Sequence, residues 1–230
     1  MHPCSGLGSA HAVCFLPPHT AYRSIDYYHC PSRTQCLPRG RLWSEFMSDV
    51  ATAIMDAAER RMRLGGFNGF SFREIAVDVG VKSSSVHYHF PTKEKLAAAV
   101  IHRYTDEVAE FIDREAATDS DPISVWTRAF RGTLCSDERM CPCAVLGAVS
   151  RDLPKELAAE VRRFFKMCLD KMMAAGLSES SASGLLATIT GALVVANALN
   201  DVATYDRAAR ELTRKPHMTR SKRNRATSKD

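Results

Sequence analysis

The feature that most constrains the fold of this chain is a pair of short helical segments joined by a glycine turn, between residues 71 and 90. Ser71 and Glu74 have the spacing of a capping box, in which the hydroxyl accepts an amide of the first turn and the carboxylate binds back to the cap. Gly80 can end this helix because glycine adopts the left-handed conformation without strain. A second short helix is expected over 83–90, beginning with three serines. The spacing therefore predicts a helix-turn-helix.

Apolar residues at helical spacing also precede and follow this motif, whereas no segment has the alternation typical of a strand. The expected fold class is therefore all-α, with a small three-helix N-terminal unit and a larger helical unit after it. Besides the motif, the expected helices are Ser48 to Leu64, a long helix from 91–93 onward, Ile123 to Leu134, a small helix before Asp152, an amphipathic helix from Pro154 to Gly176 and an uncharged helix over 182–200.

Charge is distributed unevenly along the 230 residues. The formal net charge is +5, but the segment 207–230 holds nine Lys or Arg against two acidic residues and so carries +7, which leaves −2 for the remainder. Net charge alone therefore does not indicate nucleic-acid binding by the body of the protein. It predicts a basic, disordered tail over 214–230 that could add non-specific affinity for DNA.

Residues 1–46 contain half of the prolines and half of the cysteines and lack any apolar periodicity. They are expected to be disordered, or to be an extension upstream of a true start at Met47. A zinc site from His29, Cys30 and Cys36 is a weak alternative, because paired CxxC spacing is absent. The segment has no continuous apolar run, and the eight cysteines form no short even-spaced framework, so we expect a reduced, cytoplasmic setting without a secretory signal.

The N-terminal unit resembles the signature of the TetR/AcrR family of bacterial regulators. The resemblance lies in T-A-I-M-D-A-A (52–58), G-F (66–67) and S-F-R-E-I-A-V-D-V-G-V-K-S-S-S-V-H-Y-H-F-P-T-K-E-K-L (71–96). Arg61 and His87 depart from it, since family members commonly carry an apolar residue and Tyr at those positions. The resemblance implies a transcriptional regulator, most simply a repressor, that binds palindromic double-stranded DNA as a homodimer.

The residue types in and around the second helix of the motif suit contact with DNA. Serines at the leading end allow close approach to base edges or phosphates, lysines neutralise phosphates, and the His and Tyr side chains can hydrogen-bond to them. A threonine at the start of the next helix presents free backbone amides to a phosphate. The expected DNA-binding residues are Lys82, Ser83, Ser84, Ser85, His87, Tyr88, His89, Thr92 and Lys93.

The resemblance also implies a division of the chain into a DNA-binding domain over 47–95 and an effector-binding and dimerisation domain over 96–213. In the family, the last two long helices of each subunit pair into a four-helix bundle. The stripe from Leu157 to Met172 and the uncharged helix offer more apolar surface than one subunit's core needs. A small apolar effector would release the DNA, and the candidate wall residues of its pocket are Phe111, Trp126, Phe130, Met140, Phe164 and Met167.

Three alternatives remain open at this stage. Cys135, Cys141 and Cys143 could sense oxidants, electrophiles or a soft metal, because the Cys-Pro-Cys run follows Arg139 at the expected start of a helix. An enzyme using Cys143 with His102 as base lacks any third group, so no enzymatic activity, cofactor or resident metal is expected. Residues 180–200 carry no charge and are long enough to cross a membrane, but their Ala, Gly, Ser and Thr content favours a buried helix and no membrane partner.

Overall fold

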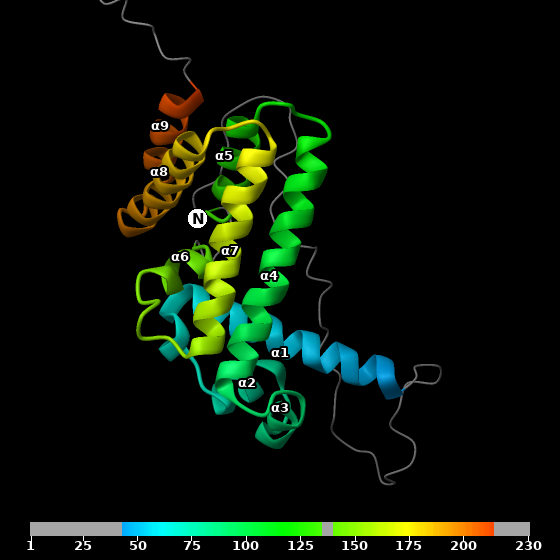
Figure 1. The fold of residues 1–230 in the computed structure, drawn as a ribbon. Coiled ribbons are helices and arrows are strands. Elements are labelled where there is room, and N and C mark those ends of the chain that lie inside the picture. The colour runs from blue at the N-terminus through cyan, green and yellow to red at the C-terminus, as the bar shows by residue number, and fades with distance from the viewer. Residues whose placement is uncertain (1–42, 135–139, 214–230) are drawn as a thin grey trace, which may run out of the picture.

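A computed structural model describes residues 43–134 and 140–213, with side chains from Asp49 onward. In these ranges the chain is all-α and contains no strand (Figure 1). The elements are α1 (Trp43–Gly65), the 3₁₀ helix η1 (Phe67–Gly69), α2 (Phe72–Val79), α3 (Ser83–His89), α4 (Lys93–Ala116), α5 (Pro122–Gly132), α6 (Pro142–Gly147), α7 (Lys155–Ala174), α8 (Glu179–Ala198) and α9 (Val202–Thr213).

Helix α1 begins at Trp43, five residues before the expected Ser48. The last four residues of the segment 1–46, predicted to be disordered, are therefore helical, and the prediction was wrong for residues 43–46. The expectations for residues 1–42, for the tail 214–230 and for Cys135 lie outside the described residues.

The three N-terminal helices form a compact head at one end of the molecule (Figure 1). The capping box is confirmed: Ser71 Oγ accepts from the Glu74 amide at 3.4 Å and donates to Glu74 Oε2 at 2.8 Å. Gly80 follows α2 with φ 73°, in the left-handed region, and its amide bonds to carbonyls at the end of α2. The chain therefore turns sharply between α2 and α3, as the sequence predicts.

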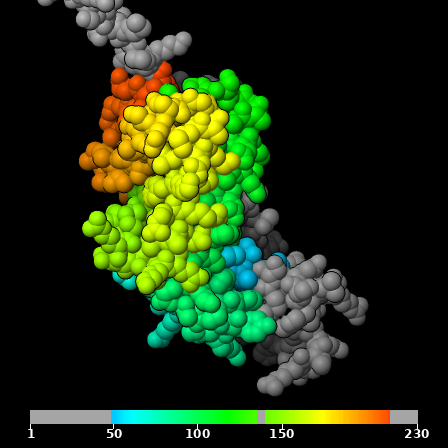
Figure 2. Space-filling model, viewed as in Figure 1, coloured from blue at the N-terminus to red at the C-terminus, as the bar shows by residue number. Residues whose placement is uncertain are grey.

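The long helices α4 and α7 lie side by side and connect the head to the far end of the molecule (Figures 1 and 2). Phe164 of α7 stacks on Tyr104 of α4 with 5.6 Å between ring centroids. The stripe of α7, formed by Leu157, Val161, Phe164, Cys168 and Met172, is buried within the subunit. The expectation that this stripe remains available to a partner was therefore wrong, because α4 already covers it.

Helix α9 was not predicted from the sequence. It packs against α5 and α8, and its buried Tyr205 donates a hydrogen bond to the Thr127 carbonyl at 2.9 Å. Arg131 of α5 binds Asp206 through both oxygens, at 2.6 and 3.1 Å. These long-range contacts hold a short helix whose own apolar face is small.

Helix α8 is, among the described residues, the one helix long and apolar enough to cross a membrane, with a mean hydropathy of 1.4 over its most apolar stretch. Only 33% of that stretch is buried inside the subunit. A substantial part of the uncharged surface of α8 is therefore uncovered in a single chain.

The left-handed turn gives a direct test of the head. Replacing Gly80 by Ala should lower the free energy of unfolding by about 1–2 kcal/mol, because a Cβ is strained at φ 73°. No atom lies within 4 Å of the added Cβ, so the loss would be conformational and not steric. Urea denaturation measures it, with Gly65→Ala as the matched control, since Gly65 also has open space around it but lacks a positive φ. Equal stability of the two variants would contradict the turn geometry.

Candidate nucleic-acid interface

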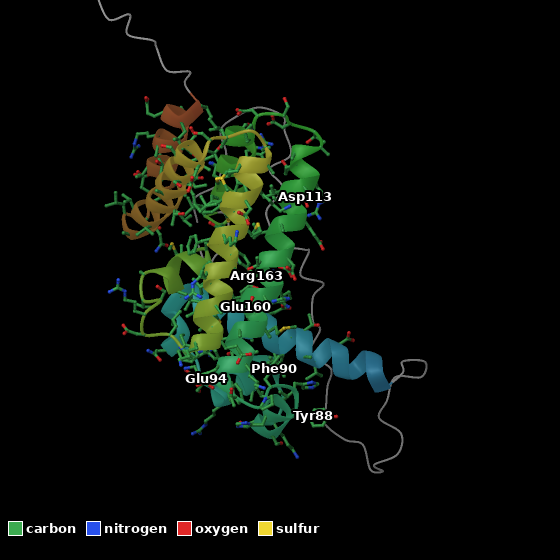
Figure 3. All side chains as sticks on the ribbon, in the orientation of Figure 1. Tyr88, Phe90, Glu94, Asp113, Glu160 and Arg163 are labelled. Carbon is green, nitrogen blue, oxygen red and sulfur yellow. The ribbon has the colours of Figure 1, made fainter. Side chains whose placement is uncertain are left out.

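Helix α3 is anchored by one side chain and leaves most of the others accessible. Val86 is buried against the head, whereas Ser84, His87 and Tyr88 are exposed and Ser83, Ser85 and His89 are half-buried. Tyr88 is 74% exposed and lies at the end of the molecule farthest from α8 and α9 (Figure 3). A helix held by its inner face, with polar residues on its outer face, can enter a groove of DNA without losing its own packing.

Ring contacts involve three side chains of α3. His87, the departure from the family pattern, lies edge-on to Phe72 of α2 with 4.6 Å between ring centroids. Tyr88 and His89 form a second edge-on pair at 5.3 Å. The His87 imidazole thus replaces an expected tyrosine and still packs on the preceding helix, while its exposed edge remains free to hydrogen-bond.

The start of α4 supplies a further cation, Lys93, close in the chain to α3. Thr92 caps this helix by accepting the Lys95 amide at 3.3 Å. The Lys93 ammonium lies over two rings of the η1 region, 4.6 Å from the centroid of Phe67 and 4.8 Å from that of Phe70. Partial burial lowers the pKa of Lys93 below its ordinary value. The rings restrict the lysine to one side of the head, and this positions its charge beside the cap.

The other departure, Arg61, clamps α2 onto α1. Its guanidinium binds Asp78 through two hydrogen bonds, Nε to Oδ2 at 2.5 Å and Nη2 to Oδ1 at 3.0 Å, and reaches Glu74 Oε1 at 3.3 Å. The pKa of Asp78 is lowered chiefly by the hydrogen bonds from Arg61. An apolar residue would stabilise this contact by burial. Here a bidentate ion pair orients α2, the helix that precedes the turn.

The structure adds two features that the sequence reasoning missed. Arg73 is exposed on α2, beside the capping box, and is a further cation on the helix-turn-helix. A charged cluster also connects α1 to α4, where Arg103 binds Asp56 at 2.8 Å and Glu59 at 3.1 Å. Arg73 lies in a short helix that also holds acidic residues. Its position in the sequence therefore does not distinguish a DNA contact from an ordinary solvent-exposed side chain. The cluster could not be found, because its partners lie far apart in the chain.

The six candidate wall residues of an effector pocket lie in and around the core of the C-terminal unit. Trp126, Phe130, Met140 and Phe164 are buried, while Phe111 and Met167 are half-buried. Trp126 and Phe130 are neighbours, with centroids 6.2 Å apart. Two cavities described in the structure, of about 680 and 330 Å³, are lined by other, mostly polar residues. The pocket therefore stays a prediction.

Cys143 and His102, considered as an enzymatic pair, have separate surroundings. Cys143 is fully buried beside Cys141, whereas His102 is exposed on α4 and lies 3.1 Å from Glu160 and 3.6 Å from Asp106. The geometry thus gives His102 carboxylate partners and gives Cys143 a thiol partner.

Together, the capped helix, the glycine turn and an outward-facing polar helix on an all-α body define a helix-turn-helix DNA-binding protein. Residues 54–100 match the family model described as bacterial regulatory proteins, tetR family. The search of curated proteins found no match.

Solved structures agree with this class. A TetR-family transcriptional regulator from Agrobacterium tumefaciens is 27% identical, with a TM-score of 0.67 over 72% of this chain and 96% of that one. A TetR regulator from Legionella pneumophila is 26% identical, with a TM-score of 0.62 over 70% and 93%. The reduced form of E. coli NemR, at 17% identity, shares the fold with a TM-score of 0.62 over 71% and 96%. These matches support a TetR-family DNA-binding transcriptional regulator, with the family's characteristic region at residues 54–100.

Substitution of Lys93 tests the cation at the start of α4. Lys93→Ala should weaken binding to all DNA sequences alike and reduce the slope of log K against log salt by about 1, because one phosphate contact is lost. Fluorescence anisotropy at several salt concentrations measures the slope. Lys171→Ala is the control, since that lysine pairs with Asp113 at the opposite end of α4. An unchanged slope in Lys93→Ala would show that this lysine packs on the two rings and does not bind a phosphate.

Proposed function

We propose that this protein is a homodimeric repressor that binds an inverted-repeat operator and is released by a small apolar effector. The observation that carries the proposal is the accessible, rigidly backed outer face of α3. A two-fold dimer presents two such faces to half-sites related by the same axis, and so selects a palindrome. We place this function in the cytoplasm.

In this proposal, the residues around α3 divide by role. Ser84 and Ser85 lie at the leading end and read base edges, whereas Lys82, Thr92 and Lys93 bind phosphates on either side. The remaining contacts come from Ser83, His87, Tyr88 and His89. Burial supports an outward-facing reading surface, because Ser84, His87 and Tyr88 are exposed whereas Val86 is buried against the head.

The dimer surface in this proposal is the exposed face of α8. It is free of charge between Glu179 and Asp201, and the space around Gly184 and Gly191 is open. Val194 and Val195 of α8 and Leu199 directly after it are exposed. A second copy would cover apolar surface that the subunit leaves in solvent, and close approach of two helices is easiest where glycines carry no side chain. The rest of this face comes from the outer side of α7, where Phe165, Leu169 and Met173 line the 330 Å³ groove together with the charged residues Arg162, Lys166 and Asp170.

The chain is proposed to divide near residue 95, with the DNA-binding domain over 47–95 and the effector and dimer domain over 96–213. Helix α4 crosses this boundary, because Arg103 of α4 binds Asp56 and Glu59 of the head and the same helix packs on α7. An effector among Phe111, Trp126, Phe130, Met140, Phe164 and Met167 would displace α4 and change the spacing of the two recognition helices.

The proposal predicts a palindromic footprint. DNase I protection by the purified protein on the DNA upstream of its own reading frame should show two protected half-sites about one helical turn apart. A reporter joined to that region should be less active when the protein is present. Protection of a single, non-repeated site, or activation of the reporter, would contradict the homodimeric repressor.

The dimer surface has a matched pair of test positions. Val195 on α8 and Val149 after α6 are both 47% exposed, so a glutamate at either costs the single subunit little. Val195→Glu should yield monomers and lose operator binding, since two buried charges would face each other across the axis. Val149→Glu should remain dimeric. Light scattering measures the mass, and a dimeric Val195→Glu would exclude this face. Recovery of the wild type only from membranes would instead assign α8 to lipid.

A further inference from the structure

Three thiols are buried where the head meets the body. Cys141 and Cys143 begin α6 and Cys168 lies in the middle of α7, and each is at most 1% exposed. In the described part of the chain no group of His, Cys, Asp or Glu is arranged to hold a metal ion.

Arg63 connects the thiols to the DNA-binding head. It lies near the end of α1, is 6% exposed, and binds Glu59 Oε1 through Nε at 3.1 Å and Nη2 at 2.7 Å. Its Nη1 donates to the Met140 carbonyl at 2.5 Å, and its guanidinium carbon lies 5.2 Å from the centroid of the Tyr104 ring. A charged side chain of the head thus holds the residue that directly precedes Cys141.

The two neighbouring thiols differ in acidity. Burial raises the pKa of Cys141, but hydrogen bonding by Cys143 and Tyr104 and the charge of Arg63 outweigh it and lower the pKa to about 7. Burial and the neighbouring Cys141 raise the pKa of Cys143 well above its ordinary value. One sulfur of the pair is therefore the better nucleophile, and the other remains protonated beside it.

We propose that Cys141 is a site of peroxide oxidation, resolved by Cys143, and that its oxidation loosens the head from the body. The Cys141 thiolate attacks one oxygen of a hydroperoxide, the O–O bond breaks, and protonation of the leaving oxygen gives an alcohol or water. Cys141 is then a sulfenic acid. The Cys143 sulfur attacks it, an S–S bond forms, and the hydroxyl leaves as water with the Cys143 proton.

The disulfide would act on DNA binding through Arg63. It removes the anionic sulfur near the guanidinium and draws residues 141 and 143 together, which displaces the Met140 carbonyl that Arg63 holds. A buried guanidinium that loses a partner is costly, so α1 is expected to shift relative to α6. Because α1 packs directly on α2 and α3, the shift would misplace the recognition helix. This step rests on the proposed DNA-binding function.

The burial of the cluster sets which reagents reach it. A hydroperoxide as small as hydrogen peroxide can enter through local opening of the turn, whereas a bulky maleimide requires unfolding of the contact. We therefore expect hydrogen peroxide to oxidise Cys141 in the folded protein under conditions in which the maleimide leaves it unlabelled.

The test compares reduced and oxidised full-length protein on the same footprinted DNA. Reduced wild type must first bind, and failure there would overturn the proposed function and not the thiol chemistry. After hydrogen peroxide, affinity should fall by about 5- to 150-fold, the usual range of coupling between sites. Dithiothreitol should restore it. Mass spectrometry should show that the peptide with Cys141 and Cys143 has lost two hydrogens.

Single substitutions separate the pair Cys141 and Cys143 from Cys168. Cys141→Ser should bind DNA and be insensitive to peroxide, whereas Cys168→Ser, also buried, should respond like the wild type. In Cys143→Ser, oxidation should stop at the Cys141 sulfenic acid, which carries one added oxygen and can be trapped by dimedone. If Cys141→Ser fails to fold by circular dichroism, Cys141→Ala takes its place. Retention of full affinity by wild type whose Cys141 has been oxidised, or loss of affinity in Cys141→Ser, would overturn the proposal.

Discussion

The orientation of the DNA-binding head on the body depends on Arg63, a charged side chain that is buried where the two meet. Arg63 satisfies its guanidinium with Glu59 of its own helix and with the Met140 carbonyl of the body. Removing one partner from such a buried pair leaves an uncompensated charge, which costs about 3–5 kcal/mol in other proteins. An apolar contact would tolerate small slippage between α1 and α6, but an arginine with fixed hydrogen-bond directions does not. The orientation of the head is therefore set by direction-dependent bonds as well as by burial.

Much of the head could be predicted from the sequence, because its signals are local. Ser71, Glu74 and Gly80 lie within one short segment and specify the cap and the turn that the structure confirms. The partner of Arg61 could not be read in this way, since Asp78 lies 17 residues further along and the pair forms only after α2 packs on α1. Arg63 belongs to a run of charged residues that is typical of a solvated face, and nothing local indicates its burial.

The body was less predictable, because its contacts are long-range. The stripe of α7 is correctly periodic, but periodicity does not say which surface covers it, and α4 of the same subunit does so. Helix α9 has one buried aromatic residue, Tyr205, and is held by bonds to α5. The DNA contacts stay predictions, because the structure contains no DNA and the operator sequence depends on both partners.

The continuity of α4 has a mechanical consequence. Its 24 residues make a rigid rod of about 36 Å, with the Thr92 cap at the DNA end and Ala116 at the other. If the rod pivots near one end, a tilt of about 5° moves the other end by about 3 Å, close to the 3.4 Å step between base pairs along one strand. In the proposed repressor, a lever of this length would turn a small rearrangement among core side chains into a shift of about one base-pair step on DNA. Such a switch would need no hinge within α4.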